Sequence, residues 1–247
     1  MNNKIEELIQ LIENSDNIVF FGGAGTSTES GIPDFRSSDG LFNEKLNKKF
    51  TPEQLVSHSF YIKYPEDFFS FYKSKLIYKE AKPNDAHLAL AKLEQSGKLK
   101  AVITQNIDGL HQMAGTKNVF ELHGSVHRNY CENCGKFYNL DEMLNLDGVI
   151  PYCEECRSIV KPDVVLYEEA LDDVVINNAV SAISSAELLI IGGTSLVVYP
   201  AAGFINYFKG KNIIVINRDN INLSRSNTLV INDSIGEVLN KAVLSNK

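Results

Sequence analysis

Residues 18–31 read IVFFGGAGTSTESG, an apolar run that passes directly into a glycine-rich turn. Four successive apolar residues at 18–21 are typical of a strand that is buried on both faces of a parallel sheet. Glycines let a backbone approach a phosphate closely, and the N–H groups that follow favour negative charge. The pattern Gly23-x-Gly25-x-x is followed by Thr28 instead of glycine, so the common dinucleotide fingerprint is incomplete. By itself this stretch predicts a nucleotide-binding turn, with an ordinary strand-to-helix turn as the alternative.

The same kind of apolar run recurs along the chain and alternates with helical patterns. Further short runs rich in Ile and Val occupy residues 100–104, 188–191 and 213–216. Helical spacing of apolar residues is found over 84–96, 173–185, 200–208 and 234–244. Strands that alternate with helices predict an α/β fold, a doubly wound parallel sheet with right-handed crossovers. Ligands bind such sheets at the carboxyl ends of the strands, so the residues after each run are candidate site residues.

Composition and charge narrow the possible functions. The chain of 247 residues has 31 acidic and 24 basic residues, a net charge of −7, which disfavours direct nucleic-acid binding. Hydrophobic residues make up 44%, so a disordered, collagen-like or coiled-coil chain is excluded. The first 17 residues carry four acidic side chains, which predicts an amphipathic surface helix instead of a signal peptide. Because no apolar run approaches the ~18–20 residues that cross a bilayer, we expect a soluble, cytoplasmic protein without membrane contact. We also expect a monomer.

All four cysteines fall into two close pairs, Cys131-x2-Cys134 and Cys153-x2-Cys156, separated by 18 residues. Two such pairs can complete a closed tetrahedral shell of thiolates around Zn²⁺, with no position left for water. The spacing therefore predicts one structural zinc site, outside the chemistry. Two disulfides or unreactive buried thiols are the alternative, which a reducing compartment disfavours. A redox site of the thioredoxin type is a further alternative, but it needs only one Cys-x2-Cys pair. A DNA-binding zinc ribbon is another, and the acidic residues that flank the cysteines argue against it.

Polar residues follow the second apolar run and a later one. Gln105, Asn106 and Asp108 come after residues 100–104 and offer amide and carboxylate groups to a ligand. His123 ends another short apolar run and is the best candidate for a base, because imidazole titrates near neutral pH. We expect structural roles for the remaining histidines, His58, His87, His111 and His127.

Three further segments add candidate ligand groups. In the loop 32–36, Arg36 can clamp a phosphate and Phe35 can cover a flat ring. The polar residues Thr194, Ser195 and Asn217 close two later strands and could hold a ribose or an adenine. For each of these polar residues taken singly, ordinary turn chemistry is at least as good an explanation.

Two stretches interrupt the alternation of strands and helices. Residues 38–82 are helical in pattern and rich in aromatic side chains, and residues 125–160 contain all four cysteines. Both are excursions from the sheet that together could build a smaller lobe. We therefore expect a large domain from residues 1–37, 83–124 and 157–247, and a small domain from a helical insert, 38–82, and a zinc-binding module, 125–156.

Taken in order, these motifs resemble those of the sirtuin family. They are GAGTS at 23–27, SGIPDFR at 30–36, TQNIDGLH at 104–111, HG at 123–124, the four cysteines, KPDVV at 161–165 and GTSLVVYP at 193–200. The resemblance covers nearly the whole chain and is closest to a compact bacterial sirtuin. It implies an NAD-dependent protein lysine deacetylase that acts on acetylated proteins or peptides. It also implies a large Rossmann-type domain and a small zinc and helical lobe, with the active cleft between them.

The resemblance further implies roles for individual residues. The residues that should contact NAD are Ala24, Thr28, Phe35, Arg36, Gln105, Asn106, Ile107, Asp108, His123, Thr194, Ser195, Asn217 and Ile235. His123, together with Asn106, should be catalytic, with His123 as the base that deprotonates a ribose hydroxyl of NAD. Asp108 should accept a hydrogen bond from the nicotinamide carboxamide. The residues that should contact the acylated substrate, bound as an added strand, are Val165, Tyr167, Val198 and Tyr72.

Two positions depart from the family pattern. Tyr167-Glu168-Glu169 stands where Phe-Gly-Glu is frequent. An acidic Glu168 beside the peptide leads to the hypothesis that basic flanking residues are preferred, which equal turnover of acidic-flanked and basic-flanked peptides would contradict. Family members that remove succinyl or malonyl groups carry Tyr-x-x-Arg, whereas Tyr72 is followed here by Lys75, which lacks the bidentate fork of arginine. Acetyl groups are therefore expected to be preferred.

Other activities are compatible with the same motifs. A protein mono-ADP-ribosyltransferase would use the same NAD site, and a deacylase of longer or acidic acyl groups would use the same cleft. A non-enzymatic, NAD-sensing module that binds acyl-lysine would have no use for a base at His123. A dehydrogenase is disfavoured because no acidic ribose ligand lies at the usual offset from the glycine turn.

Overall fold

A parallel sheet of six strands forms the centre of the fold in the computed structural model, which describes residues 2–34, 50–221, 223 and 225–245. In spatial order the strands are β3 (Val119–Glu121), β2 (Leu99–Thr104), β1 (Ile18–Gly22), β7 (Leu188–Gly192), β8 (Asn212–Ile216) and β9 (Thr228–Ile231). The doubly wound α/β sheet and its four predicted strands are confirmed. Because the strand order reverses between β1 and β7, the loops after these strands run to opposite sides and leave a crevice.

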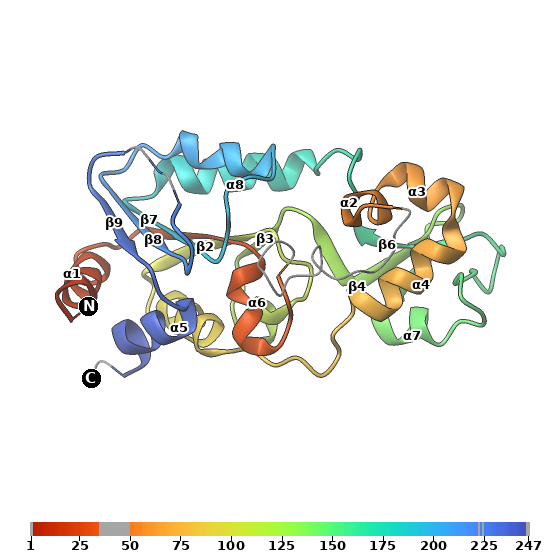
Figure 1. The fold of residues 1–247 in the computed structure, drawn as a ribbon, viewed down its shortest axis with the longest axis horizontal. Helices are drawn as coiled ribbons and strands as arrows, with labels where there is room; N and C mark the ends of the chain where they lie inside the picture. Colours follow the sequence, from red (N-terminus) through yellow and green to blue (C-terminus); the bar gives the residue numbers. More distant parts are fainter. Residues whose placement is uncertain (1, 35–49, 222, 224, 246–247) are drawn as a thin grey trace.

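Helices cover both faces of this sheet (Figure 1). One apolar core joins the face that includes Phe20 to α1 (Asn2–Glu13), α5 (Asp85–Gln95) and α9 (Ile235–Leu239). The other core joins the face that includes Phe21 to α8 (Asp173–Ser185) and the 3-10 helix η4 (Ala201–Tyr207). The predicted helices at 84–96 and 173–185 are confirmed. The pattern at 200–208 forms a 3-10 helix, and the pattern at 234–244 forms α9 followed by a π-helical turn, η5 (Asn240–Leu244).

A second, antiparallel sheet lies beside the first and carries the cysteines. Its strands, in spatial order, are β5 (Phe137–Asn139), β4 (Gly124–Cys131) and β6 (Val160–Val164). The helices around it are α2 (Pro52–Leu55), α3 (His58–Lys63), α4 (Pro65–Lys75) and α7 (Leu140–Leu144). A third apolar core contains Phe68 and Tyr72 of the helical insert together with Val126 and Val160 of the cysteine-bearing sheet.

The shared core supports the grouping of the two excursions into one unit, and we propose that they form a small lobe. Strand β6 pairs with β4 through residues 160–164, so the small sheet extends beyond residue 156, where the predicted boundary stands. Among the helices of the described ranges, none combines the length and apolar character needed to cross a membrane.

An ion-pair network ties the end of the large sheet to the small one. Arg128 on β4 donates to Glu121 on β3 at 2.6 Å and to Asp163 on β6 at 2.7 Å. Glu121 is largely buried, so this pair is less screened by solvent than an ordinary surface ion pair. The network spans the short connection that carries His123, and it therefore fixes that residue relative to both sheets.

Candidate active site

A cleft with a volume of about 420 Å³ lies where the loops of the large sheet face the small sheet. This volume is within the usual range for small-molecule and cofactor sites. The sequence-predicted residues that line it are Ala24, Gln105, Asn106, Ile107, Asp108, His123, Val165, Tyr167, Thr194, Ser195, Val198 and Asn217. Residues from the ends of β1, β2, β7 and β8 thus meet in one place, as expected for the carboxyl edge of a parallel sheet.

Of the other predicted residues, three described ones do not line the cleft. Thr28 starts the turn η2 (Thr28–Ser30), where its hydroxyl donates to the carbonyl of Gly25 at 3.0 Å. Ile235 is buried in the core beneath the sheet, and Tyr72 is fully buried and stacked on Phe68. Phe35 and Arg36 lie outside the described residues.

The glycines of the turn let two loops approach each other. The N–H of Gly25 donates to the carbonyl of Gly193 at 2.8 Å, and a Cβ on Gly25 would lie 2.8 Å from the Cα of Gly193. Gly193 itself has φ +59°, in the region that favours glycine. Close packing of the β1 and β7 loops therefore requires both glycines, a role that adds to the phosphate approach predicted for the turn at Gly25.

Asp108 is held in place by a short chain of hydrogen bonds. Ser27 donates its hydroxyl to Oδ2 of Asp108 at 2.6 Å and accepts from the amide of Asn106 at 3.0 Å. The other carboxylate oxygen of Asp108 accepts from the N–H of Leu110 at 3.0 Å. Sequence reasoning did not predict Ser27 as a site residue. The signal for it is a hydroxyl residue inside the glycine turn, which a parallel sheet brings close to the carboxylate that follows a neighbouring strand.

His127 is a second residue that sequence reasoning did not assign to the site. Its Nε2 lies 3.0 Å from the carbonyl oxygen of Asp108, and its ring lies against Gly109, where a Cβ would approach within 2.7 Å. His127 therefore supports the backbone of the Asp108 loop and lines the same cleft. Gln105 completes the frame, because its amide donates to the hydroxyl of Thr194 at 3.1 Å and so links the ends of β2 and β7.

The hydrogen bond of His123 defines which of its nitrogens can act as a base. Nδ1 lies 2.9 Å from the carbonyl oxygen of Gln105. A carbonyl can only accept, so Nδ1 carries the proton and Nε2 of the neutral ring keeps its lone pair. Burial lowers the pKa of His123 below its usual 6.5, although the hydrogen bond to Gln105 acts in the opposite direction. The ring is therefore mostly neutral at pH 7 and able to accept a proton.

Two buried histidines pack together beneath the Asp108 loop. His87 on α5 and His111 on α6 (Leu110–Met113) have ring centroids 4.7 Å apart. Neither ring nitrogen of His111 has a hydrogen-bond partner among the described residues. Burial lowers the pKa of His87 to about 4, and burial followed by the charge of His87 lowers the pKa of His111 well below 6.5. Both rings are neutral in the folded protein at neutral pH.

This pair predicts a loss of stability in mild acid. An unfolded histidine has a pKa near 6.5, so below that pH the unfolded chain binds more protons than the folded chain, and stability rises with pH. Between pH 7 and pH 5 we expect the free energy of unfolding to fall by about 2 kcal/mol through His87, with His111 adding in the same direction. Urea unfolding at both pH values, repeated with His111→Leu, measures the effect. An equal loss in the variant and the wild type would rule out a contribution from His111.

The four thiols of the cysteine pairs converge on one point. All four Sγ atoms lie within 4.8 Å of one another. The Sγ atoms of Cys131 and Cys156 are 3.3 Å apart, and those of Cys134 and Cys153 are 3.7 Å apart. Tetrahedral Zn–S bonds of ~2.3 Å place sulfur atoms about 3.8 Å apart, and disulfide sulfurs would be bonded at about 2.05 Å. The donor set therefore fits one Zn²⁺ and not two disulfides.

A tyrosine supports this set of thiols from the side. The hydroxyl of Tyr138 donates to Sγ of Cys153 at 3.3 Å and accepts from the N–H of Glu154 at 3.1 Å. The hydrogen bond from Tyr138 is the main reason that the pKa of Cys153 falls to about 6. A lowered pKa favours the thiolate, which is the form that binds metal.

The segment after β6 lines the cleft together with the loops that follow β1, β2, β7 and β8. The N–H of Val165 donates to the carbonyl of His123 at 3.0 Å. The main-chain N–H and C=O of Tyr167 are both bonded to the helical insert, to Val56 and His58 respectively. The N–H of Tyr167 is therefore already bonded within the chain, and Val198 lines the opposite edge of the cleft.

Comparisons with known proteins agree with this geometry. A family model described as "Sir2 family" matches residues 23–200. The chain is 68% identical to an NAD-dependent protein deacetylase of Clostridium perfringens, over 98% of this chain and 100% of the relative. It is 58% identical to an NAD-dependent protein deacetylase of Clostridium acetobutylicum, over 97% and 98%. A solved structure described as Sir2 with a p53 peptide and NAD+ matches with a TM-score of 0.83 and 37% identity, over 96% of each chain.

Proposed function

The chain belongs to the Sir2 family, and from this premise we infer that it is an NAD-dependent protein deacetylase. It removes acetyl groups from lysine side chains of proteins and yields nicotinamide, 2′-O-acetyl-ADP-ribose and the free lysine. The observation that carries this function is the environment of His123. Its ring lines the cleft shared by the strand-end loops, with Nδ1 held by Gln105 and Nε2 left to accept a proton.

We propose that NAD binds along the carboxyl edge of the large sheet. Amide and hydroxyl groups of Gln105, Asn106, Thr194, Ser195 and Asn217 line this part of the cleft, and they are suited to ribose and carboxamide groups. Asp108, fixed by Ser27, is positioned as an acceptor for the carboxamide. Ala24 and Ile107 complete the wall, whereas Thr28 and Ile235 would act from behind it.

The chain contributes orientation and proton transfer to the reaction. NAD supplies the reactive ribose carbon and the leaving nicotinamide when it is bound. The two walls of the cleft hold the acetyl-lysine and the ribose in line, which replaces a bimolecular encounter with a preorganised one. His123 accepts the proton of a ribose hydroxyl at Nε2, a contribution of about 10²–10⁴-fold for a well-placed base. The four thiols close the coordination shell of Zn²⁺, so the metal supports the small sheet and leaves the chemistry to the cleft.

Incubation with NAD and an acetyl-lysine peptide tests this function directly. We expect one nicotinamide to be released for each acetyl group lost. Absorbance or chromatography measures the nicotinamide, and mass spectrometry of the peptide measures the loss of the acetyl group. A peptide that instead gains the mass of ADP-ribose would assign the chain to protein ADP-ribosyl transfer. Binding of NAD and peptide without turnover would assign it to a sensing module.

The acyl preference gives a further prediction. Lys75 lines the cleft, but Tyr72 is fully buried in the aromatic core and does not reach it. A Tyr-x-x-Arg pair that could clamp a carboxylate is therefore not formed, and lysine provides only a point charge. We expect at least about tenfold higher kcat/KM for an acetylated than for a succinylated version of one peptide. Steady-state kinetics on the matched pair measure the ratio, and comparable values would contradict the prediction.

We also propose that the protein acts as a cytoplasmic monomer that does not bind nucleic acid directly. A net charge of −7 supports the last point, because phosphate backbones repel an acidic surface. The four thiols that converge on one point support the cytoplasmic location, because cysteines stay reduced in that compartment.

A further inference from the structure

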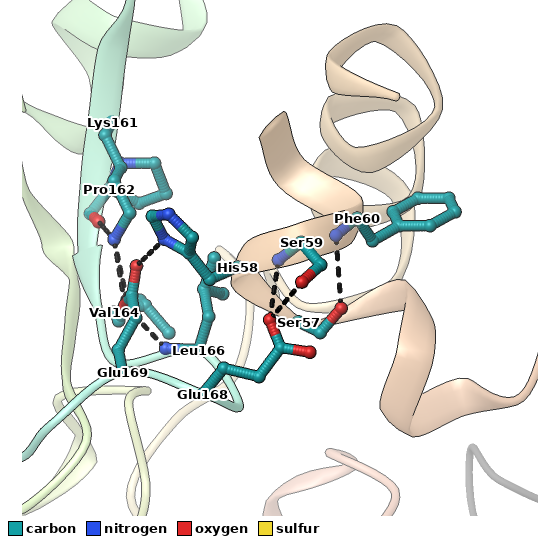
Figure 2. Close-up of polar contacts among 10 residues, drawn as sticks. All are labelled: Ser57, His58, Ser59, Phe60, Lys161, Pro162, Val164, Leu166, Glu168 and Glu169. Carbon is teal, nitrogen blue, oxygen red and sulfur yellow. Dashed lines mark hydrogen bonds and ion pairs between the residues drawn. The ribbon is translucent and has the colours of Figure 1, made fainter. Parts of the chain in front are cut away.

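Glu168 lines the cleft and is hydrogen-bonded to Ser59 of the helical insert (Figure 2). Its carboxylate oxygen Oε2 accepts two hydrogen bonds from Ser59, one from the backbone N–H at 2.8 Å and one from the hydroxyl at 2.6 Å. Ser59 lies in the first turn of α3, where backbone N–H groups have no partner within the helix. The carboxylate therefore satisfies a donor that the helix itself leaves unpaired.

The backbone of Glu168 shows that this contact is maintained against a conformational preference. Glu168 has φ +77°, in the left-handed region that glycine adopts freely and that a residue with a Cβ avoids. A strained glutamate persists only where its surroundings determine it, and here the two bonds from Ser59 do so.

Neighbouring contacts give the loop 165–169 a second anchor. Tyr167 pairs through its main chain with Val56 and His58, each at 3.0 Å. Glu169 turns inward instead, where its carboxylate accepts from the N–H of Leu166 at 2.8 Å and lies 2.9 Å from Nδ1 of His58. Glu169 thus closes the loop on itself and also contacts His58 of the insert, while Glu168 adds the contact to Ser59.

We propose that Glu168 is a positioning residue for the acetyl-lysine peptide, because it holds the loop 165–169 against α3 and so fixes the wall on which the peptide lies. Val165, Tyr167 and Glu168 all line the cleft. The kinetic part of this proposal rests on the proposed deacetylase function, whereas the structural part does not. Among the described residues, the loops that follow strands of the large sheet make none of these contacts, so we expect NAD binding to be independent of Glu168.

The variant Glu168→Gly tests the proposal most sharply, because it removes the carboxylate and also relieves the strained backbone. We expect the KM for the peptide to rise about tenfold, with kcat and the KM for NAD changed less than about twofold. Glu168→Gln keeps one accepting oxygen and should raise the peptide KM only about threefold. Ser59→Ala should also raise the peptide KM about threefold. The double variant Ser59→Ala/Glu168→Gly should have the same peptide KM as Glu168→Gly alone.

Glu66→Gln is the matched control, since Glu66 is an exposed glutamate on α4 of the same insert. It should leave all kinetic constants unchanged. An unchanged peptide KM in Glu168→Gly would overturn the proposal. A second outcome would also overturn it. If Glu168→Gln changes the relative turnover of Lys-flanked and Glu-flanked peptides and Ser59→Ala does not, Glu168 acts on the peptide through its charge.

Amide hydrogen exchange provides a readout that needs no activity. The N–H groups of Tyr167 and His58 should lose protection in Glu168→Gly and keep it in Glu66→Gln. Retained protection in Glu168→Gly would overturn the anchoring role even if deacetylation is confirmed. If the wild type fails to deacetylate, the proposed function fails, and the exchange result still decides whether Glu168 anchors the loop.

Discussion

Replacement of His123 by alanine is expected to lower kcat/KM for deacetylation by about 10³-fold, the usual effect of removing a well-placed base. The affinity for NAD should change little, because the strand-end loops that line the rest of the cleft are bonded to one another independently of this ring. Steady-state kinetics with an acetyl-lysine peptide and a separate titration of NAD measure the two effects.

The pH dependence offers an independent check on His123. Burial lowers the pKa of His123, so the acid limb of the kcat/KM profile should have its midpoint below 6.5, with activity lost as Nε2 becomes protonated. The residual activity of His123→Ala should lack this limb. Measurements are confined to pH values at which the wild type remains folded, because the His87 and His111 pair is expected to destabilise the fold in acid.

His127→Ala is the matched control for a lost imidazole in the same cleft. Among the described residues, the side chain of His127 has one hydrogen-bond partner, the backbone carbonyl oxygen of Asp108 at 3.0 Å. Its removal should cost less than about tenfold, the scale of one lost hydrogen bond. Equal losses in the two variants would show that His123 acts through the shape of the cleft and not as a base.

Loss of zinc is expected to have the second large effect. A structural Zn²⁺ contributes about 10–16 kcal/mol of apparent binding free energy to a small module. Chelation, or the variant Cys153→Ala, should therefore remove stoichiometric zinc and unfold the β4–β6 sheet. Because Val165 and Tyr167 directly follow β6, we expect deacetylation to fall at least about 100-fold. Metal analysis, hydrogen exchange over residues 124–164 and the peptide assay measure these changes.

Tyr138→Phe is the control that leaves all four thiols in place. It removes only the hydroxyl that donates to Cys153, so zinc should bind about tenfold more weakly while the sheet stays folded. Full activity and full amide protection in zinc-free Cys153→Ala would contradict a structural role for the metal. Thiol titration of the denatured wild type should give four free thiols once zinc is removed.

Much of the site could be predicted because its residues follow strands that the sequence marks clearly. Residues 105–108 come directly after β2, and Thr194 and Ser195 come after β7, so the parallel sheet brings them together. Tyr72 differs, because its helical position gave no sign that aromatic packing against Phe68 would turn it away from the cleft. The neutral tautomer of His123 likewise depends on a carbonyl of Gln105, 18 residues earlier in the chain.

The sequence by itself determined the family, the parallel sheet and the zinc ligands, because apolar runs and Cys-x2-Cys spacings act over a few neighbouring residues. Only the tertiary structure decided what Glu168 does. Its partner Ser59 lies 109 residues away in the chain, and the left-handed backbone at Glu168 is seen only in the folded chain. Contacts of this kind depend on how segments far apart in the sequence pack, and packing is a property of the whole folded chain that no local pattern encodes.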